Sequence, residues 1–257
     1  YINDAFGSAH RNHASTSVVA NYFHKKKCFG HLMSLEVRSL KLALEKPKRP
    51  FTAIIGGAKI TGKIDVIKSL FKQVDYLIIG GGMAYTFIRA LKGNTGKSLC
   101  DEEKIGLAKE LIDMSKNYSV SLVLPTDSIN ACEFKNDAKI NTSDIFFIPS
   151  DYIGLDIGPD SIHKFTEVIS ASKTIIWNGP MGVFEFKNFQ EGTKKIASSI
   201  ALATKKGAYS LVGGGDSVAA IKHFNLEGCF SYISTGGGAM LEYLEGKELP
   251  GVSSIES

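Results

Sequence analysis

Short runs of apolar residues, many of them β-branched, recur along the chain, and each ends in glycine or a polar turn. These runs occupy residues 52–57, 76–81, 122–125, 174–179, 209–214 and 230–235. Continuous apolar runs are typical of strands that are buried on both faces, as in a parallel sheet. Helix-like patterns lie between them, at residues 101–116, 188–203 and 215–223. The alternation of strand, glycine turn and helix predicts an α/β fold with a doubly wound parallel sheet and flanking helices.

The region before residue 52 has a different pattern. One apolar stripe is formed by Met33, Val37, Leu40 and Leu44. Their spacing predicts a helix of about three turns. The prolines within residues 46–50 end it, because proline lacks an amide donor and disfavours helix in the residue before it. We expect this helix to lead into the sheet, and residues 1–32 are too few to form a domain by themselves.

Composition narrows the classes of partner. Hydrophobic residues make up 44% of the chain and charged residues 22%, as in an ordinary globular protein. The net charge of +4 is too small to indicate nucleic acid or a membrane surface, and no apolar run approaches a membrane span in length. The opening residues lack the basic start and apolar core of a signal peptide. The four cysteines have no CxxC spacing, so we expect free thiols in a reducing compartment.

Glycine clusters follow four of the predicted strands. They are Gly56-Gly57 and the triple glycines at 80–82, 213–215 and 236–238. Glycine lets the backbone turn sharply and approach a ligand closely, and the helix that follows offers free N–H groups to a phosphate. Tight packing of strand on helix would explain one such turn. Four turns at the carboxyl edge of one sheet favour a phosphate-binding site.

Two lysines follow the first glycine turn. Residues 57–63 match G-x-x-x-x-G-K, but Ile64 stands where a P-loop needs Ser or Thr for Mg²⁺, so we reject a P-loop. Lys59 and Lys63 are four residues apart, and they would share a helical face at the sheet edge if this segment begins a helix. The alternative is that both are ordinary solvated lysines.

Two acids are further candidates. Asp216 follows the third glycine turn at a predicted helix start, where it is either an N-cap or a ligand for Mg²⁺, which commonly takes one or two carboxylates plus phosphate oxygens. Glu185 ends the string Trp-Asn-Gly-Pro-Met-Gly-Val-Phe-Glu. It is either a surface acid or an acceptor for the hydroxyl groups of a ribose.

Several strings in this sequence resemble the phosphoglycerate kinase family, in order and over nearly the whole chain. They are residues 3–15, 56–59, 80–83, 154–159, 177–185, 213–217, 234–239 and 244–247. The resemblance implies a glycolytic kinase that moves the acyl phosphate of 1,3-bisphosphoglycerate to Mg-ADP, giving 3-phosphoglycerate and ATP reversibly. It also implies two Rossmann-like domains. Residues 1–32 would be a remnant of the N-terminal substrate domain, 33–50 the interdomain helix and linker, and 51–257 the C-terminal nucleotide-binding domain.

The resemblance also implies roles for individual residues. Lys59 would stabilise the phosphoryl group during its transfer, together with the backbone N–H groups of Gly215 and Gly237. Arg11, with His10 nearby, would bind phosphoglycerate; no metal is expected there, because no third ligand joins His10 and His13. Asp216 would hold Mg²⁺ together with the nucleotide phosphates. The nucleotide itself would be bound by Lys63, Gly81, Gly82, Gly154, Leu155, Asn178, Val183, Glu185, Gly214, Gly215, Asp216 and Ser217.

The substrate loops that the family carries earlier in its N-terminal domain have no counterpart in this sequence. We therefore expect the chain by itself to bind nucleotide weakly, to transfer almost no phosphate and to expose an apolar face. We expect a cytoplasmic monomer whose partners are ADP or ATP and phosphoglycerate.

Two other functions compete with this one. The first is a nucleotide-binding module without catalytic activity. The second is a nicotinamide-dependent dehydrogenase of the same fold class, which needs G-x-G-x-x-G and an acid about 20 residues further on. No stretch of this sequence has that pattern.

Overall fold

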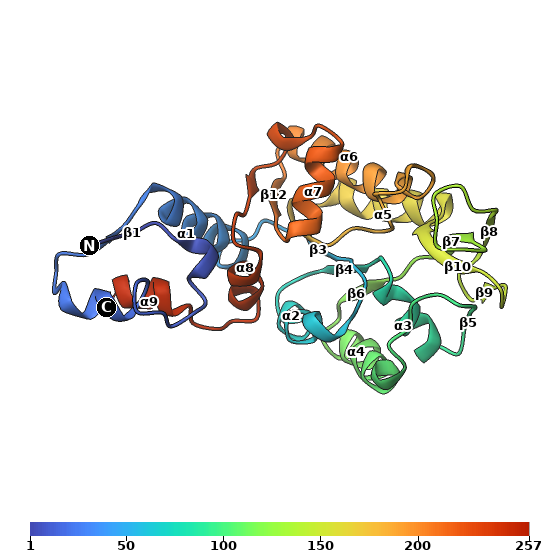
Figure 1. Cartoon of the computed structure of the whole chain (residues 1–257), viewed down its shortest axis with the longest axis horizontal. Coiled ribbons are helices and arrows are strands. Elements are labelled where there is room, and N and C mark those ends of the chain that lie inside the picture. The colour runs from blue at the N-terminus through green and yellow to red at the C-terminus, as the bar shows by residue number, and fades with distance from the viewer. Residues whose placement is uncertain (257) are drawn as a thin grey trace.

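The computed structural model describes residues 1–256, and a six-stranded parallel sheet forms its centre (Figure 1). The strand order is β13-β12-β11-β3-β4-β6. The strands are β3 (Phe51–Ile55), β4 (Tyr76–Ile79), β6 (Ser121–Val123), β11 (Thr174–Asn178), β12 (Tyr209–Val212) and β13 (Tyr232–Ile233). The chain runs outward from β3 to β6, crosses back to β11 and runs outward to β13 on the other side. The predicted doubly wound parallel sheet is therefore confirmed.

Helices cover both faces of this sheet. Ala53 and Ile55 of β3 belong to one apolar core, whereas Ile54 belongs to the other. The first core is completed by α1 (His31–Leu44), α2 (Ile64–Leu70), α3 (Met83–Ala90), α4 (Ile105–Asn117) and α8 (Gly237–Leu244). The second is completed by α5 (Pro159–Ala171), α6 (Glu191–Lys205) and α7 (Gly215–His223). Since successive side chains enter different cores, the strands are continuous apolar runs.

The ends of several elements differ from the prediction by a few residues. Helix α7 has the predicted bounds, but α4 begins only after the 3-10 turn η4 (Glu102–Lys104), and α6 begins after η5 (Lys187–Phe189). Strand β13 follows the turn η6 (Glu227–Cys229) and has two residues, fewer than the apolar run suggested. None of the helices in the described part of the chain combines the length and apolar character that a membrane span needs.

A small antiparallel sheet was missed by the sequence reasoning. It has the order β10-β7-β8, with β7 at Asp127–Ala131, β8 at Ile140–Asp144 and β10 at Ile153–Ile157. Strand β8 reads Ile-Asn-Thr-Ser-Asp and is largely exposed, so it has no apolar run to reveal it. The short pair β5 (Asn94–Thr95) and β9 (Phe147–Ile148) lies beside this sheet, at the right of Figure 1.

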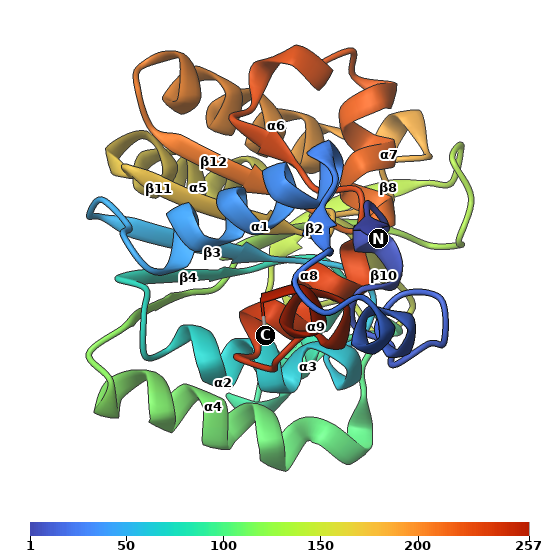
Figure 2. The same ribbon diagram turned by 90° about the vertical axis from the view of Figure 1, so that its left-hand side faces the viewer.

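The two ends of the chain pack together at the other side of the molecule (Figures 1 and 2). Here lie β1 (Ile2–Asn3), η1 (Phe6–Ser8), η2 (Val18–Tyr22), β2 (Cys28–Phe29) and α9 (Pro250–Glu256). The Asn3 side chain donates a hydrogen bond to the Gly251 carbonyl (3.0 Å), and the Gly251 N–H donates to the Ala9 carbonyl (2.8 Å). The last helix thus packs on the first residues, although the predicted domain division separates them. That division stays a prediction.

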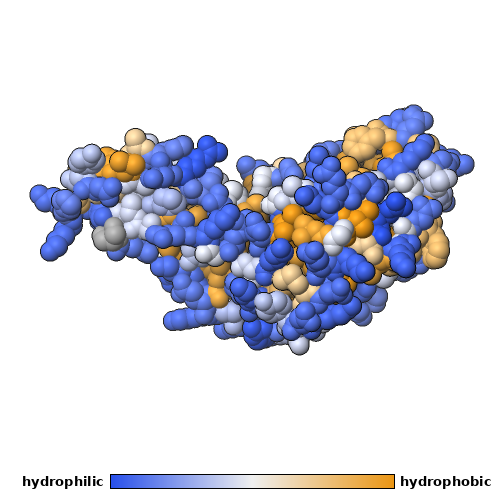
Figure 3. Space-filling view, turned by 90° about the horizontal axis from the view of Figure 1, so that it is seen from below, coloured by the Kyte–Doolittle hydropathy of each residue, from blue (hydrophilic) through white to orange (hydrophobic). Residues whose placement is uncertain are grey.

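The surface carries exposed apolar side chains among polar ones, as Figure 3 shows for one face. The most exposed of the large ones at the paired chain ends are Ile2 (68%) and Tyr22 (80%). The outline in Figure 3 is indented between this end of the molecule and the sheet with its helices. Whether apolar exposure limits solubility stays a prediction.

Candidate functional site

The four glycine turns follow β3, β4, β12 and β13, at the edge where the parallel strands end. A pocket of about 480 Å³ opens at this edge. Among the residues predicted to bind nucleotide, those that line it are Gly81, Gly82, Gly154, Leu155, Val183, Glu185 and Asp216. The tertiary structure therefore brings together residues that lie up to 135 positions apart in the sequence.

Gly81 shows why this edge needs glycine. Its φ is +66°, and a Cβ on it would lie 2.6 Å from the Gly57 carbonyl oxygen and 2.8 Å from that of Pro180. The Gly57 N–H donates to the Pro180 carbonyl (2.9 Å), and the Gly81 N–H donates to that of Met181 (3.2 Å). The turns after β3, β4 and β11 thus pack backbone against backbone, which leaves no room for a side chain.

A second close approach joins the turns after β12 and β13. A Cβ on Gly237 would lie 3.0 Å from the Cα of Gly214. Gly214 has a φ of +97° and faces the side chain of Asn178, whose amide donates to the Gly213 carbonyl (2.9 Å). Helices α7 and α8 begin right after these turns, and no side chain caps either start. Their first N–H groups are therefore free to bind an anion.

Lys63 brings a buried positive charge to the strand ends. It closes the 3-10 turn η3 (Thr61–Lys63), and its ammonium group donates to the carbonyls of Gly56 (2.5 Å) and Asn178 (3.3 Å). Burial lowers the pKa of Lys63 to about 8, while the nearby Asp216 carboxylate raises it. The charged form has lost much of its hydration, so an anion that reaches this group would be bound strongly.

Lys59 lies differently from Lys63. Helix α2 begins only at Ile64, after η3, so the two lysines do not share a helical face as the four-residue spacing suggested. The side chain of Lys59 is exposed, whereas that of Lys63 is folded down onto the strand ends. The contribution of Lys59 to catalysis stays a prediction.

The polar groups at the start of α7 point in two directions. Asp216 is exposed and lines the pocket, so its carboxylate is free to meet a cation. Ser217 is buried, and its hydroxyl accepts a hydrogen bond from the Gly179 N–H (2.6 Å). That contact ties α7 to the turn after β11. The predicted contact of Ser217 with phosphate therefore competes with a structural one.

The far end of the pocket is built by the small antiparallel sheet. Gly154 and Leu155 lie on β10, and the Leu155 carbonyl accepts a hydrogen bond from the Val183 N–H (2.8 Å). A Cβ on Gly154 would collide with the hydroxyl of Tyr85, which itself bonds Ser128 (2.8 Å). This end is lined by apolar side chains, and it suits a nucleotide base better than a phosphate.

Comparison with known proteins shows which family the chain resembles. The family model for phosphoglycerate kinase matches residues 1–247. The chain belongs to the phosphoglycerate kinase family. It is 50% identical over 257 residues to a phosphoglycerate kinase of Porphyromonas gingivalis and 51% identical over 256 residues to one of Dictyoglomus turgidum. The solved phosphoglycerate kinase of Coxiella burnetii is 43% identical, with a TM-score of 0.95 over 99% of this chain.

These relatives are longer than the chain. The match covers the whole chain but 62% of the Porphyromonas protein and 64% of the Dictyoglomus and Coxiella proteins. The phosphoglycerate kinase of Pyrococcus horikoshii, 29% identical with a TM-score of 0.85, is covered to 63%. The similarity thus fixes the family and the fold of the part that is present.

The residues predicted to bind phosphoglycerate lie outside the pocket, close to the last glycine turn, residues 236–238. A Cβ on Gly238 would lie 3.5 Å from Nε2 of His10, and Arg11 Nε lies 3.3 Å from the same nitrogen. The N-terminal segment therefore approaches the last glycine turn. Among residues 1–256, no group of three or more His, Cys, Asp or Glu side chains is placed to hold a metal ion.

Some residues that line the pocket were not predicted from the sequence. They include Tyr85, Lys97, Leu99 and Phe134. Phe134 comes from the β7–β8 connection and packs on Phe186 with ring centroids 5.1 Å apart. No local pattern marks these side chains, because only the tertiary structure brings their segments together. Tyr85 lies on α3, Lys97 and Leu99 lie between β5 and α4, and Phe134 lies between β7 and β8.

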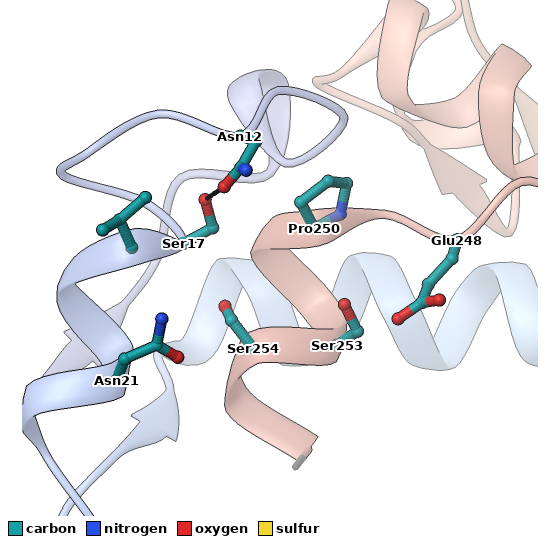
Figure 4. A pocket seen from close by; sticks show the side chains of 8 residues that line it. Asn12, Ser17, Asn21, Glu248, Pro250, Ser253 and Ser254 are labelled. Carbon is teal, nitrogen blue, oxygen red and sulfur yellow. Dashed lines mark hydrogen bonds between the residues drawn. The ribbon is translucent and has the colours of Figure 1, made fainter.

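A second hollow, of about 340 Å³, lies between the N-terminal segment and α9 (Figure 4). Asn12 and Ser17 lie on one side, where the Ser17 hydroxyl donates to the Asn12 amide oxygen (2.6 Å), and Pro250 and Ser253 lie on the other. No residue predicted to bind nucleotide or phosphoglycerate lines this hollow.

Proposed function

We propose that this chain is the nucleotide-binding part of a phosphoglycerate kinase and binds Mg-ADP or Mg-ATP at the carboxyl edge of its sheet. The observation that carries the proposal is one pocket at the strand ends, lined by Asp216 and by glycines of the turns after β3 and β4. The ammonium group of Lys63 is bonded to the Gly56 carbonyl in the first of these turns. Free amide N–H groups and a desolvated cation suit the phosphates, and the apolar end suits the base.

The reaction proposed for the whole enzyme is reversible transfer of the acyl phosphate of 1,3-bisphosphoglycerate to ADP. The bond from the carboxyl oxygen to phosphorus breaks as the bond from the terminal ADP oxygen forms. Such transfers need positioning and charge neutralisation more than covalent chemistry. Lys59, Lys63 and the N–H groups that open α7 and α8 would supply these. Lys59→Ala in an intact enzyme is expected to lower kcat roughly 10²- to 10³-fold.

The donor set fits magnesium bound together with a nucleotide. Mg²⁺ usually takes one or two carboxylates plus phosphate oxygens and water, and Asp216 is the carboxylate at the phosphate end. Bound there, the ion would neutralise charge that develops on the transferring phosphate. Glu185, which also lines the pocket, would accept hydrogen bonds from the ribose.

Calorimetric titration of the purified chain with Mg-ADP tests the binding step. We expect saturable binding, about tenfold weaker in Asp216→Asn when Mg²⁺ is present and within twofold of wild type when Mg²⁺ is chelated. Glu227→Gln, an exposed acid beyond α7, is the matched control and should change neither value. Absence of ADP binding at millimolar concentration, or an Asp216→Asn variant that binds Mg-ADP normally, would overturn the proposal.

The second candidate is a binding module that performs no transfer, and the 62–64% coverage of the relatives makes this a separate question. A coupled assay for ATP formation from 1,3-bisphosphoglycerate decides between them. Binding of phosphoglycerate by Arg11 and His10, a monomeric state and a cytoplasmic location belong to the kinase proposal and rest on the family.

A further inference from the structure

Asp156 is a buried carboxylate that the proposed chemistry does not use. It lies on β10 with 2% of its surface exposed, and it is not among the residues that line the pocket. A buried carboxylate is costly to keep unless it makes hydrogen bonds that the fold needs. The question is therefore what its two oxygen atoms hold.

The carboxylate joins β10 to the start of α6. Oδ2 accepts a hydrogen bond from the Gly192 N–H in the first turn of α6 (2.7 Å), and Oδ1 accepts one from the Ile157 N–H (2.9 Å). Burial raises the pKa of Asp156 to about 8, while these two N–H groups lower it. Gly192 and Gly182 both lack side chains where Asp156 lies, since a Cβ on either would collide with Oδ1.

The same region shapes the end of the pocket. The pairing of β10 with β7 shifts between Gly154 and Asp156, so Leu155 is the extra residue of a β-bulge. Bulges re-aim the residues around them, and here the Leu155 carbonyl accepts the Val183 N–H (2.8 Å). Leu155 and Val183 are two of the apolar side chains that line the pocket. Asp156 directly follows Leu155 in the chain, and it contacts Gly182, which directly precedes Val183.

Helix α6 also contacts the loop that carries Val183. The Thr193 hydroxyl accepts hydrogen bonds from the N–H groups of Met181 (3.0 Å) and Gly182 (3.3 Å). Gly192 and Thr193 are neighbours in the first turn of α6. One turn of helix therefore binds Asp156 on one side and the Val183 loop on the other.

We infer that Asp156 is a positioning residue that fixes the Leu155 bulge and the Val183 loop against each other, and so sets the width of the base end of the nucleotide pocket. It touches neither the nucleotide nor the transferring phosphate. This inference rests on the proposed nucleotide binding. It predicts that Asp156 governs affinity for the base and has little effect on affinity for the phosphates, because the phosphate groups meet the glycine turns and Lys63 at the other end.

The experiment compares Asp156→Ala with Asp127→Ala. Asp127 is the matched control, because it is a second buried carboxylate of the same small sheet and accepts the N–H groups of Asp160 (3.0 Å) and Ser161 (2.8 Å) in the first turn of α5. Both variants lose a helix-start contact, but α5 does not carry a wall of the pocket. Thr193→Val, which removes the Thr193 acceptor and little volume, is the second test variant should Asp156→Ala not fold.

Affinity for Mg-ADP is measured by calorimetry, and affinity for magnesium pyrophosphate by competition against ADP. We expect Asp156→Ala and Thr193→Val to weaken Mg-ADP about tenfold, which is about 1.4 kcal/mol. Pyrophosphate should stay within twofold of wild type for both, and Asp127→Ala should leave both ligands within twofold. A general loss of structure would weaken the binding of both ligands, whereas the proposed role weakens only the binding of Mg-ADP.

The outcomes are distinct. Equal weakening of ADP and pyrophosphate, no weakening of ADP, or the same selective loss in Asp127→Ala would each overturn the role of Asp156. Failure of wild type to bind Mg-ADP would instead overturn the proposed function on which the inference rests.

Discussion

Binding of ADP at pH 8 should be accompanied by uptake of about half a proton, and Lys63 should be the group that takes it up. Burial holds the pKa of Lys63 at about 8, well below the ordinary lysine value. A polyphosphate beside the ammonium group supplies the opposite charge that favours the protonated form. Nucleotide binding should therefore return the pKa toward its ordinary value of about 10.4.

The size of the effect follows from the pKa of the free protein. At pH 8 the free Lys63 is about half protonated and the bound one almost fully, so about 0.5 proton enters per site. At pH 7 the free group is already about 0.9 protonated, and uptake falls to about 0.1 proton. The uptake should therefore rise about fivefold between pH 7 and pH 8, which distinguishes Lys63 from groups that titrate lower.

Calorimetry in two buffers of different ionisation enthalpy measures this uptake, because the observed heat changes by the buffer enthalpy times the protons taken up. Lys63→Arg, which stays charged at both pH values, should bind ADP with no buffer dependence from this site. Asp156→Ala should keep the wild-type uptake per bound ADP. A wild-type binding enthalpy at pH 8 that does not depend on the buffer would refute the account of Lys63.

Two further substitutions test the packing around the site, and urea unfolding measures their effect. Gly81→Ala is expected to lower the free energy of unfolding by about 1–3 kcal/mol. Alanine is strained at a φ of +66°, and its Cβ would press on the backbone of the neighbouring turns. Glu36→Ala is expected to lower the free energy of unfolding by about 2–3 kcal/mol in the same assay, because buried Glu36 accepts hydrogen bonds from both the N–H (2.7 Å) and the hydroxyl (2.8 Å) of Thr235. Glu36→Gln should lower it less, since glutamine keeps an acceptor.

Matched controls accompany both substitutions. Gly106 is exposed in the first turn of α4, where a Cβ meets nothing within 4 Å, and Gly106→Ala should stabilise the protein by about 0.5–1 kcal/mol. Glu256 pairs with Lys41 on the surface, and Glu256→Ala should stay within about 0.5 kcal/mol of wild type. If Gly81→Ala behaved like Gly106→Ala, or Glu36→Ala like Glu256→Ala, the packing argument for that position would be wrong.

The glycine turn after β3 illustrates what can be read along the chain. The four inner strands of the large sheet are runs of largely apolar residues, because they are buried between two layers of helices. The edge strands β6 and β13 are shorter and partly exposed. Once the strands are parallel, their carboxyl ends must share one edge, so the glycine turns that follow them are placed there as well. The fold class and the edge at which the glycine turns lie could therefore be predicted without coordinates.

Lys59 and Lys63 show where such reasoning stops. Both follow the same turn, yet one is exposed and the other donates to two carbonyls at the strand ends. Their difference depends on whether the segment is helix or 3-10 turn, which a four-residue spacing does not decide. Ser217 is similar, since its hydroxyl was predicted for phosphate but is bonded to the Gly179 N–H.

The sequence by itself determined the alternation of elements, the sheet that follows from it and the family. Only the tertiary structure decided which segments form the apolar end of the pocket and which N–H groups Asp156 accepts. The reason is physical: apolar periodicity reports burial against neighbouring layers, whereas a bulge, a half-polar antiparallel sheet and a carboxylate shared by β10 and α6 depend on contacts between segments far apart in the chain.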